Sequence, residues 1–221
     1  MSAPTALLLS GTGRYADQGH PFAATSEALA ALLGEAGFDV VAAADVDAAL
    51  EWLTSPWNWP DLLAVNIGNP SDPAPSPGPA AAAGLRAWLA GDRPLLGLHS
   101  SSTAFPDLPE WKPALGGHLV PETSLHPEYG SAKVLVTDGF GPLGADLSDP
   151  ADLSGGADLS GGDAVLHPLV WSHQRAGGGR SFYDALGHDA ASFDSPGHRQ
   201  LLRRGIDWLS ASVPAESSGV G

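Results

Sequence analysis

Short apolar runs alternate with longer segments of helical periodicity along the first hundred residues. In one such segment, Leu29, Leu32 and Leu33 recur three and four positions apart, as on one face of a helix. The predicted strands are residues 6–10, 38–43, 62–68 and 94–98, and the predicted helices are residues 21–36, 47–53 and 80–90. Because strands and helices alternate, the pattern predicts an α/β fold, in which a parallel sheet with right-handed crossovers is flanked by helices.

The rest of the chain has fewer regular segments. The elements predicted there are a loop-rich stretch at 105–127, strands at 133–137, 166–173 and 179–186, and a helix that opens at Pro196. A glycine-rich hairpin at 176–178 joins the last two strands, and Ser195 has the side chain of a helix cap. We therefore expect a single domain over residues 1–212, followed by a flexible tail over 213–221.

Two long loops interrupt this pattern. Residues 69–79 hold five prolines, which favours a stiff, extended segment on the crevice side of the sheet. Residues 145–162 repeat a hexapeptide that begins Ala-Asp-Leu-Ser three times. A calcium-binding β-roll needs a glycine-rich period of about nine residues, so the repeat indicates a flexible surface loop instead.

Two shorter stretches have both a structural and a functional interpretation. Gly11 and Gly13 fit only part of a dinucleotide-binding loop, since the third glycine and a matching acidic residue are missing, and a tight turn is favoured. Three tryptophans lie between residues 52 and 59. Such rings can stack on sugars, but large aromatic side chains more often pack into the protein, which is what we expect here.

The turn after the strand at 94–98 is the strongest candidate for chemistry. His99 lies two residues after Gly97 and two before Ser101, which is the spacing of the G-x-S-x-G elbow that presents a nucleophile. In parallel sheets the ligand crevice lies beyond the carboxyl ends of the strands. We therefore expect His99 to face that crevice, with Ser100 beside it.

Other histidines stand in loops that a parallel sheet would bring to the same edge. His20 occupies the place where Ser, Thr, Asp or Asn usually caps a helix, His188 and Asp189 follow the last strand, and His126 lies in an adjoining loop. We expect these loops to form a shared polar pocket. Neutral imidazoles with Asp189 suit zinc or a similar divalent ion, and histidines also suit proton transfer. No HExxH spacing decides between the two.

The composition of the chain excludes several classes of binding partner. The 221-residue chain has a net charge of −15 and only ten Lys and Arg, so neither nucleic acid nor an anionic membrane is expected as a partner. It has no cysteine, which excludes disulfides and thiol enzymes. With no signal-peptide pattern and no membrane-spanning apolar run, we expect a cytoplasmic protein. The acidic charge does not oppose a homodimer through the tryptophan-rich segment.

Several stretches of the chain resemble the ThuA, or trehalose utilisation, family. They are residues 97–100, 126–127, 178–183, 186–189 and 192–194. The resemblance extends over most of residues 5–210 and implies a flavodoxin-like fold of the class I glutamine amidotransferase-like type. Amidotransferases of this class carry a cysteine at the elbow, where this chain has His99, and His188 resembles their later histidine. Glutaminase activity is therefore not expected.

The resemblance also implies a substrate class. ThuA-like proteins are associated with the breakdown of trehalose and related disaccharides through 3-keto sugars. A 3-keto group acidifies its neighbouring C–H bonds, so proton transfer can drive isomerisation or elimination of a glycosidic bond. In this interpretation His99 and His188 act as base and acid or as metal ligands, and Asp189 orients or ligates. The residues expected to bind a small carbohydrate are His20, Ser100, His126, Arg180 and Tyr183. For the last two a structural role is favoured over catalysis, with Arg180 holding the hairpin and Tyr183 in the core.

The leading hypothesis is a carbohydrate-processing isomerase, lyase or hydrolase that acts on a keto sugar or 3-keto glycoside by histidine acid–base or metal-assisted chemistry. Two alternatives stay open: a catalytically silent module that binds a sugar or a protein, and a metal-dependent hydrolase. Between His126 and the hairpin the chain departs from the family, because the Ala-Asp-Leu-Ser repeats stand where an acidic, aromatic stretch is usual.

Overall fold

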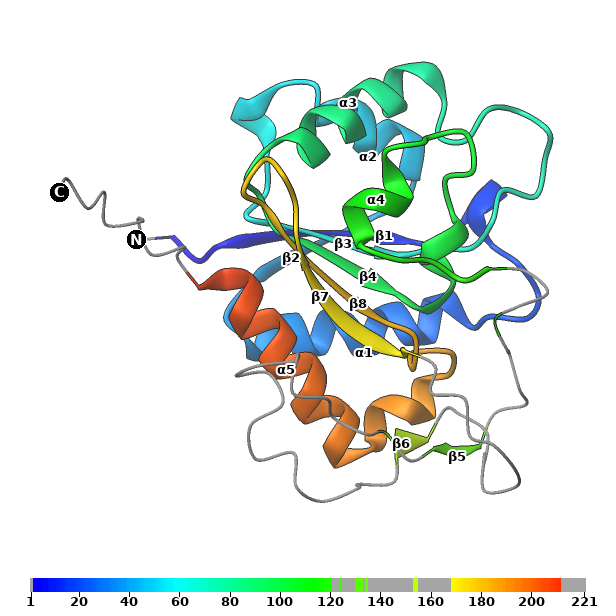
Figure 1. The fold of residues 1–221 in the computed structure, drawn as a ribbon, viewed down its shortest axis with the longest axis vertical. Coiled ribbons are helices and arrows are strands. Elements are labelled where there is room, and N and C mark those ends of the chain that lie inside the picture. The colour runs from blue at the N-terminus through cyan, green and yellow to red at the C-terminus, as the bar shows by residue number, and fades with distance from the viewer. Residues whose placement is uncertain are drawn as a thin grey trace, which may run out of the picture.

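The computed structural model describes residues 2–120, 124, 130–132, 134, 153–154 and 168–211. Within these residues a six-stranded sheet has the strand order β2-β1-β3-β4-β8-β7, and helices cover both of its faces (Figure 1). The sheet strands are β1 (Thr5–Ser10), β2 (Asp39–Ala43), β3 (Leu62–Asn66), β4 (Leu95–Leu98), β7 (Val170–Gln174) and β8 (Arg180–Asp184). All neighbours are parallel except β7, which pairs antiparallel with β8. The predicted α/β, flavodoxin-like arrangement is confirmed.

The helices divide between the two faces of the sheet. They are α1 (Phe22–Glu35), α2 (Val46–Trp52), α3 (Pro79–Ala90), α4 (Trp111–Leu115) and α5 (Pro196–Ser210). Figure 1 shows α1 and α5 on one face and α2, α3 and α4 on the other. Side chains of β1 alternate accordingly: Leu7 and Leu9 join the core under α2 and α3, whereas Ala6 and Leu8 join the core under α1 and α5. None of the helices in the described part of the chain has the length and apolar character needed to cross a membrane.

Several short elements complete the described residues. They are the 3-10 helices η1 (Gly13–Tyr15), η2 (Pro56–Asn58), η3 (His99–Thr103) and η5 (Ala190–Asp194) and the two-residue strands β5 (Ser131–Ala132) and β6 (Leu153–Ser154). η1 confirms the tight turn expected at the first glycines. β6, which falls within the repeats, pairs antiparallel with β5. The rest of 145–162, most of 133–137 and the tail 213–221 lie outside the described residues.

Three further details differ from the sequence-based expectations. α4 forms within the stretch expected to be loops, because Pro113 falls in its first turn, where no backbone donor is needed, and Trp111 is fully buried. α1 begins at Phe22, so the cap position belongs to Pro21 and not to His20. Trp52 and Trp57 are 67% and 95% exposed, so the packing expected of the tryptophans is wrong for these two.

The order of the strands places a crevice at one edge of the sheet. The chain runs from β1 to β2 on one side and then returns to β3 on the other side of β1. At such a switch point the loops after the neighbouring strands diverge and leave a ligand-sized gap beyond their carboxyl ends. The loops after β1, β3, β4 and β8 therefore surround one location.

Candidate functional site

Three histidines meet at that carboxyl edge. His20 lies in the loop after β1, His99 directly follows β4, and His188 lies in the loop after β8. Their ring centroids are 5.0 Å (His20 to His99), 4.8 Å (His20 to His188) and 4.9 Å (His99 to His188) apart. One nitrogen of each ring lies within 4.8 Å of the other two, and all three side chains are half-buried. The structure thus brings together three loops that are far apart in the sequence.

His99 has the strained backbone of an elbow. Its φ is +45°, in the left-handed region that side chains with a Cβ seldom adopt. The hydroxyl of Tyr183 donates to the His99 carbonyl, and the hydroxyl of Ser100 donates to the carbonyl of Ile67 at the end of β3. The Nδ1 of His99 lies 2.6 Å from the carbonyl oxygen of Ala185. Because a carbonyl only accepts, Nδ1 of His99 carries a proton and donates this hydrogen bond.

His20 is oriented by a carboxylate that the sequence analysis did not select. Its Nδ1 lies 2.7 Å from Oδ1 and 2.9 Å from Oδ2 of Asp17, three residues earlier. Asp17 Oδ1 also accepts a hydrogen bond from the backbone N–H of Gly19, at 2.8 Å. Because a carboxylate only accepts, Nδ1 of His20 donates to Asp17, as Nδ1 of His99 donates to Ala185. An aspartate three residues before a loop histidine was the available signal, but sequence alone does not show that the two side chains meet.

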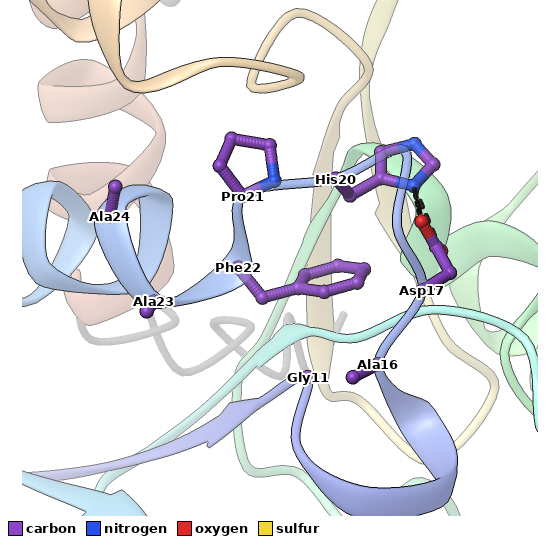
Figure 2. Close-up of a pocket in the computed structure, with 8 residues that line it drawn as sticks. All are labelled: Gly11, Ala16, Asp17, His20, Pro21, Phe22, Ala23 and Ala24. Atoms are coloured by element: carbon purple, nitrogen blue, oxygen red, sulfur yellow. Dashed lines mark hydrogen bonds and ion pairs between the residues drawn. The ribbon is translucent and has the colours of Figure 1, made fainter.

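A shallow pocket of about 350 Å³ opens beside His20. Figure 2 shows the Asp17–His20 pair on one side of it and the first turn of α1 on the other, with the ring of Phe22 between them. The residues lining it are Gly11, Ala16, Asp17, His20, Pro21, Phe22, Ala23 and Ala24. Apart from the Asp17–His20 pair, the wall is made of apolar and small residues.

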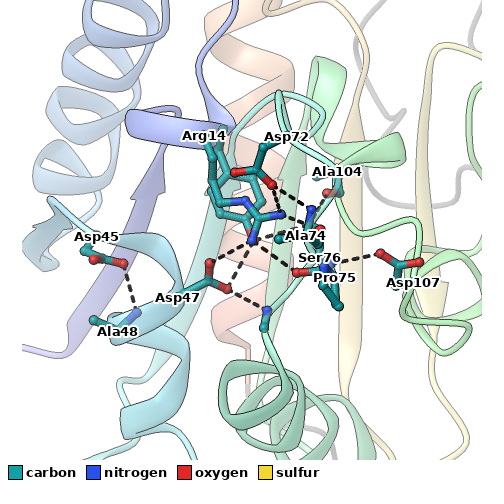
Figure 3. A network of polar contacts seen from close by, with 12 residues as sticks. Arg14, Asp45, Asp47, Ala48, Asp72, Ala74, Pro75, Ser76, Ala104 and Asp107 are labelled. Carbon is teal, nitrogen blue, oxygen red and sulfur yellow. Dashed lines mark hydrogen bonds and ion pairs between the residues drawn. The ribbon is translucent and has the colours of Figure 1, made fainter.

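Arg14 connects the loop that carries Asp17 and His20 to the proline-rich loop and to α2. Its guanidinium lies 2.8 Å from the carboxylate of Asp72 and donates to the carbonyls of Ala74 and Pro75, in the proline-rich loop (Figure 3). It also lies 3.6 Å from the carboxylate of Asp47 on α2. These contacts fix the proline-rich loop against the loop after β1.

The loop that carries His188 is anchored by a fully buried pair, Asp184 and His198. Asp184 Oδ2 lies 2.7 Å from Nε2 of His198, and Asp184 Oδ1 accepts from the backbone N–H of Leu186 at 2.7 Å. His198 Nδ1 donates to the carbonyl of Ser192, 2.9 Å away. Burial by itself lowers the pKa of His198, but the Asp184 carboxylate and the Ser192 carbonyl outweigh it and raise that pKa overall. No pattern in the sequence pairs these two positions.

Two crystal structures resemble the whole chain. A ThuA-like protein from Parabacteroides merdae matches with a TM-score of 0.66 and 16% identity, covering 96% of this chain and 94% of that one. A ThuA-like protein from Bacteroides uniformis matches with a TM-score of 0.63 and 16% identity, covering 95% and 93%. The family profile ThuA, described as trehalose utilisation, matches residues 146–209. The chain therefore shares the fold of these two ThuA-like proteins. No curated protein matches it.

Arg180 and Tyr183, which the resemblance to the ThuA family indicates as site residues, lie towards opposite ends of β8. Tyr183 is buried, and its hydroxyl holds the elbow through the His99 carbonyl; burial is the main cause that raises its pKa. Arg180 stands at the opposite end of β8 and donates to the carbonyls of Trp208 and Ala211. The structure therefore does not bring Arg180 to the three histidines.

The remaining predicted residues are Asp189 and His126. The carboxylate of Asp189 accepts from the N–H of Ala191 at 2.9 Å and so caps η5. Among the described residues, the cluster of possible metal ligands consists of the three histidines and does not include Asp189. His126 lies outside the described residues.

Proposed function

We propose that this ThuA-like chain is a carbohydrate-processing enzyme that acts on a keto sugar or 3-keto glycoside, with a divalent metal ion such as zinc held by His20, His99 and His188. The observation that carries the proposal is the convergence of three imidazoles from three separate loops at the carboxyl edge of the sheet. Three protein ligands leave coordination positions open to a substrate, as in catalytic zinc sites.

The spacing of the rings supports a single shared ion. The ring centroids are 4.8, 4.9 and 5.0 Å apart, and one nitrogen of each ring lies within 4.8 Å of the other two. One divalent ion would take one nitrogen from each ring.

The hydrogen bonds around the rings also support metal binding. Histidine ligands characteristically donate their second ring N–H to a carboxylate or a backbone carbonyl. His20 has such a partner in Asp17, and His99 has one in the Ala185 carbonyl. In both rings Nε2 is therefore the nitrogen that would bind an ion.

The chemistry follows from the substrate class. A divalent ion held by the three histidines would polarise a carbonyl oxygen of the substrate and make the neighbouring C–H bonds more acidic. The chain's own residues hold the site: Tyr183 and Ser100 fix the elbow, and Arg14 fixes the loop of His20. The description of the ThuA family as trehalose utilisation supports a carbohydrate as the substrate.

Metal binding is tested with untagged protein by elemental analysis and by zinc titration against a competing chelator. We expect about one ion per chain, and a loss of affinity of more than about 100-fold in His20→Ala, His99→Ala and His188→Ala. His118→Ala is the control, because His118 lies outside the cluster. A wild-type protein that takes up no ion, or variants that bind like the control, would contradict the metal site.

The reaction is tested by incubating the zinc-loaded protein with 3-keto trehalose and following the products by NMR. Isomerisation or loss of the glycosidic bond, abolished in His99→Ala but kept in His118→Ala, is the expected result. Binding of the sugar without turnover would favour the silent binding module instead. Cleavage of glycosides that carry no keto group would favour a metal-dependent hydrolase.

A further inference from the structure

We infer that Asp17 is a positioning residue for His20, and that Gly68 makes room for the Asp17 carboxylate. The inference rests on the proposed metal site, since it concerns how one of its three ligands is oriented. Asp17 contacts His20 but is not one of the three residues that would hold the ion, so its effect on metal binding would act through the imidazole.

The contact between Asp17 and His20 determines which nitrogen of His20 would bind an ion. Both carboxylate oxygens of Asp17 lie within hydrogen-bond distance of Nδ1, at 2.7 and 2.9 Å. The backbone N–H of Gly19 holds Oδ1 from another direction, at 2.8 Å. A carboxylate accepts and does not donate, so Nδ1 carries a proton, and Nε2 is the nitrogen through which His20 would bind an ion. Without such a partner, a histidine side chain in water favours a proton on Nε2, the nitrogen that would have to bind the ion.

Gly68 leaves the space in which the Asp17 carboxylate lies beside His20. It follows β3, and its N–H donates to the carbonyl of Tyr15 in the neighbouring loop, at 2.8 Å. A Cβ added at Gly68 would lie 2.7 Å from Oδ2 of Asp17, 3.1 Å from the Tyr15 carbonyl oxygen and 3.1 Å from the ring of Phe22. The Phe22 ring is buried and the carbonyl belongs to the backbone, so the carboxylate is the group that would move.

A positioning role and a merely structural role predict different results. The Asp17 and His20 side chains are 38% and 20% exposed, and partly exposed ion pairs contribute little to stability. Partners that orient a metal-binding histidine, in contrast, change metal affinity by about 10- to 100-fold. Removal of Asp17 should therefore weaken zinc binding while leaving the melting temperature nearly unchanged.

The test compares Asp17→Ala and Gly68→Ala with two matched controls. Asp61→Ala removes the same charge from an aspartate that pairs with Arg93. Gly34→Ala adds the same methyl where no atom lies within 4 Å of it. We expect zinc affinity to fall about 10- to 100-fold in Asp17→Ala and to fall also in Gly68→Ala, with both controls like the wild type.

A second measurement uses metal-free protein, so that it does not depend on the metal site. Long-range ¹H–¹⁵N NMR at pH 8 reports which nitrogen of His20 carries the proton. We expect Nδ1 in the wild type and in both controls, and a shift towards Nε2 in Asp17→Ala and Gly68→Ala.

Each outcome decides the inference. Wild-type zinc affinity in Asp17→Ala would overturn it, even if the metal site itself is confirmed. If the wild type takes up no zinc, the proposed function fails, and the NMR measurement then decides the inference. If Nδ1 of His20 still carries the proton in Asp17→Ala, the positioning role is overturned. If the proton shifts towards Nε2, the positioning role is supported.

Discussion

The buried pair of Asp184 and His198 should control both the stability of the fold and the integrity of the site. Both side chains are completely buried, and their nearest atoms are 2.7 Å apart. Asp184→Ala would leave His198 Nε2 and the N–H of Leu186 without their partner inside the protein. Removing one partner of a buried ion pair costs about 3–5 kcal/mol, which for a chain of this size lowers the melting temperature by about 6–20 °C.

Asp184→Asn should lower the free energy of unfolding much less than Asp184→Ala does, and it should change how that free energy depends on pH. Its amide oxygen can still accept from Leu186, and its NH₂ can donate to Nε2 of a neutral His198, so we expect a loss of about 1–2 kcal/mol. In the wild type the folded pKa of His198 is raised above its ordinary value of about 6.5. Stabilisation from such a group is complete below about pH 6.5 and is lost as the pH rises through the folded pKa.

Urea unfolding of the wild type, Asp184→Ala and Asp184→Asn at pH 6, 7, 8 and 9 measures both effects. The gap in unfolding free energy between the wild type and Asp184→Asn should be largest at pH 6 and should shrink as the pH rises. A gap that stays constant or widens would refute the assignment of the proton to His198. A wild-type midpoint in Asp184→Ala would refute the structural role of the pair.

Three further predictions concern other parts of the molecule. Gly177→Ala should destabilise the fold by about 1–3 kcal/mol in urea, because the added Cβ would lie 2.2 Å from the backbone carbonyl of Ala90; a neutral result would mean that the hairpin does not pack on α3 as described. Tyr183→Phe should cost about 1 kcal/mol and weaken zinc binding, since it removes the hydrogen bond to the His99 carbonyl; equal zinc affinity would show that the elbow holds without it. Zinc at 100 times its dissociation constant should add about 2.7 kcal/mol, seen as a rise of about 5–10 °C in melting temperature, and no rise would argue against binding to the folded state.

The sequence by itself determined the class of the fold. Apolar runs such as Leu7–Leu9 can be buried only inside a sheet covered on both faces, and the helical periodicity between them supplies the covering helices. Every predicted strand and helix of the first hundred residues exists, with ends shifted by at most two residues. The gathering of His20, His99 and His188 could also be predicted, because the carboxyl ends of parallel strands share one edge.

Only the tertiary structure decided how the site is supported. Arg180 is close in sequence to Tyr183 and was grouped with it, but a strand rises about 3.3 Å per residue, so a residue at the start of β8 lies at the far edge of the sheet. Asp17 and Gly68 are separated by fifty residues and meet through strand order, and Asp184 and His198 meet because α5 folds back onto β8. Periodicity encodes which face of an element is buried. It does not encode which side chains of different elements lie within 3 Å of each other, and those contacts orient the histidines.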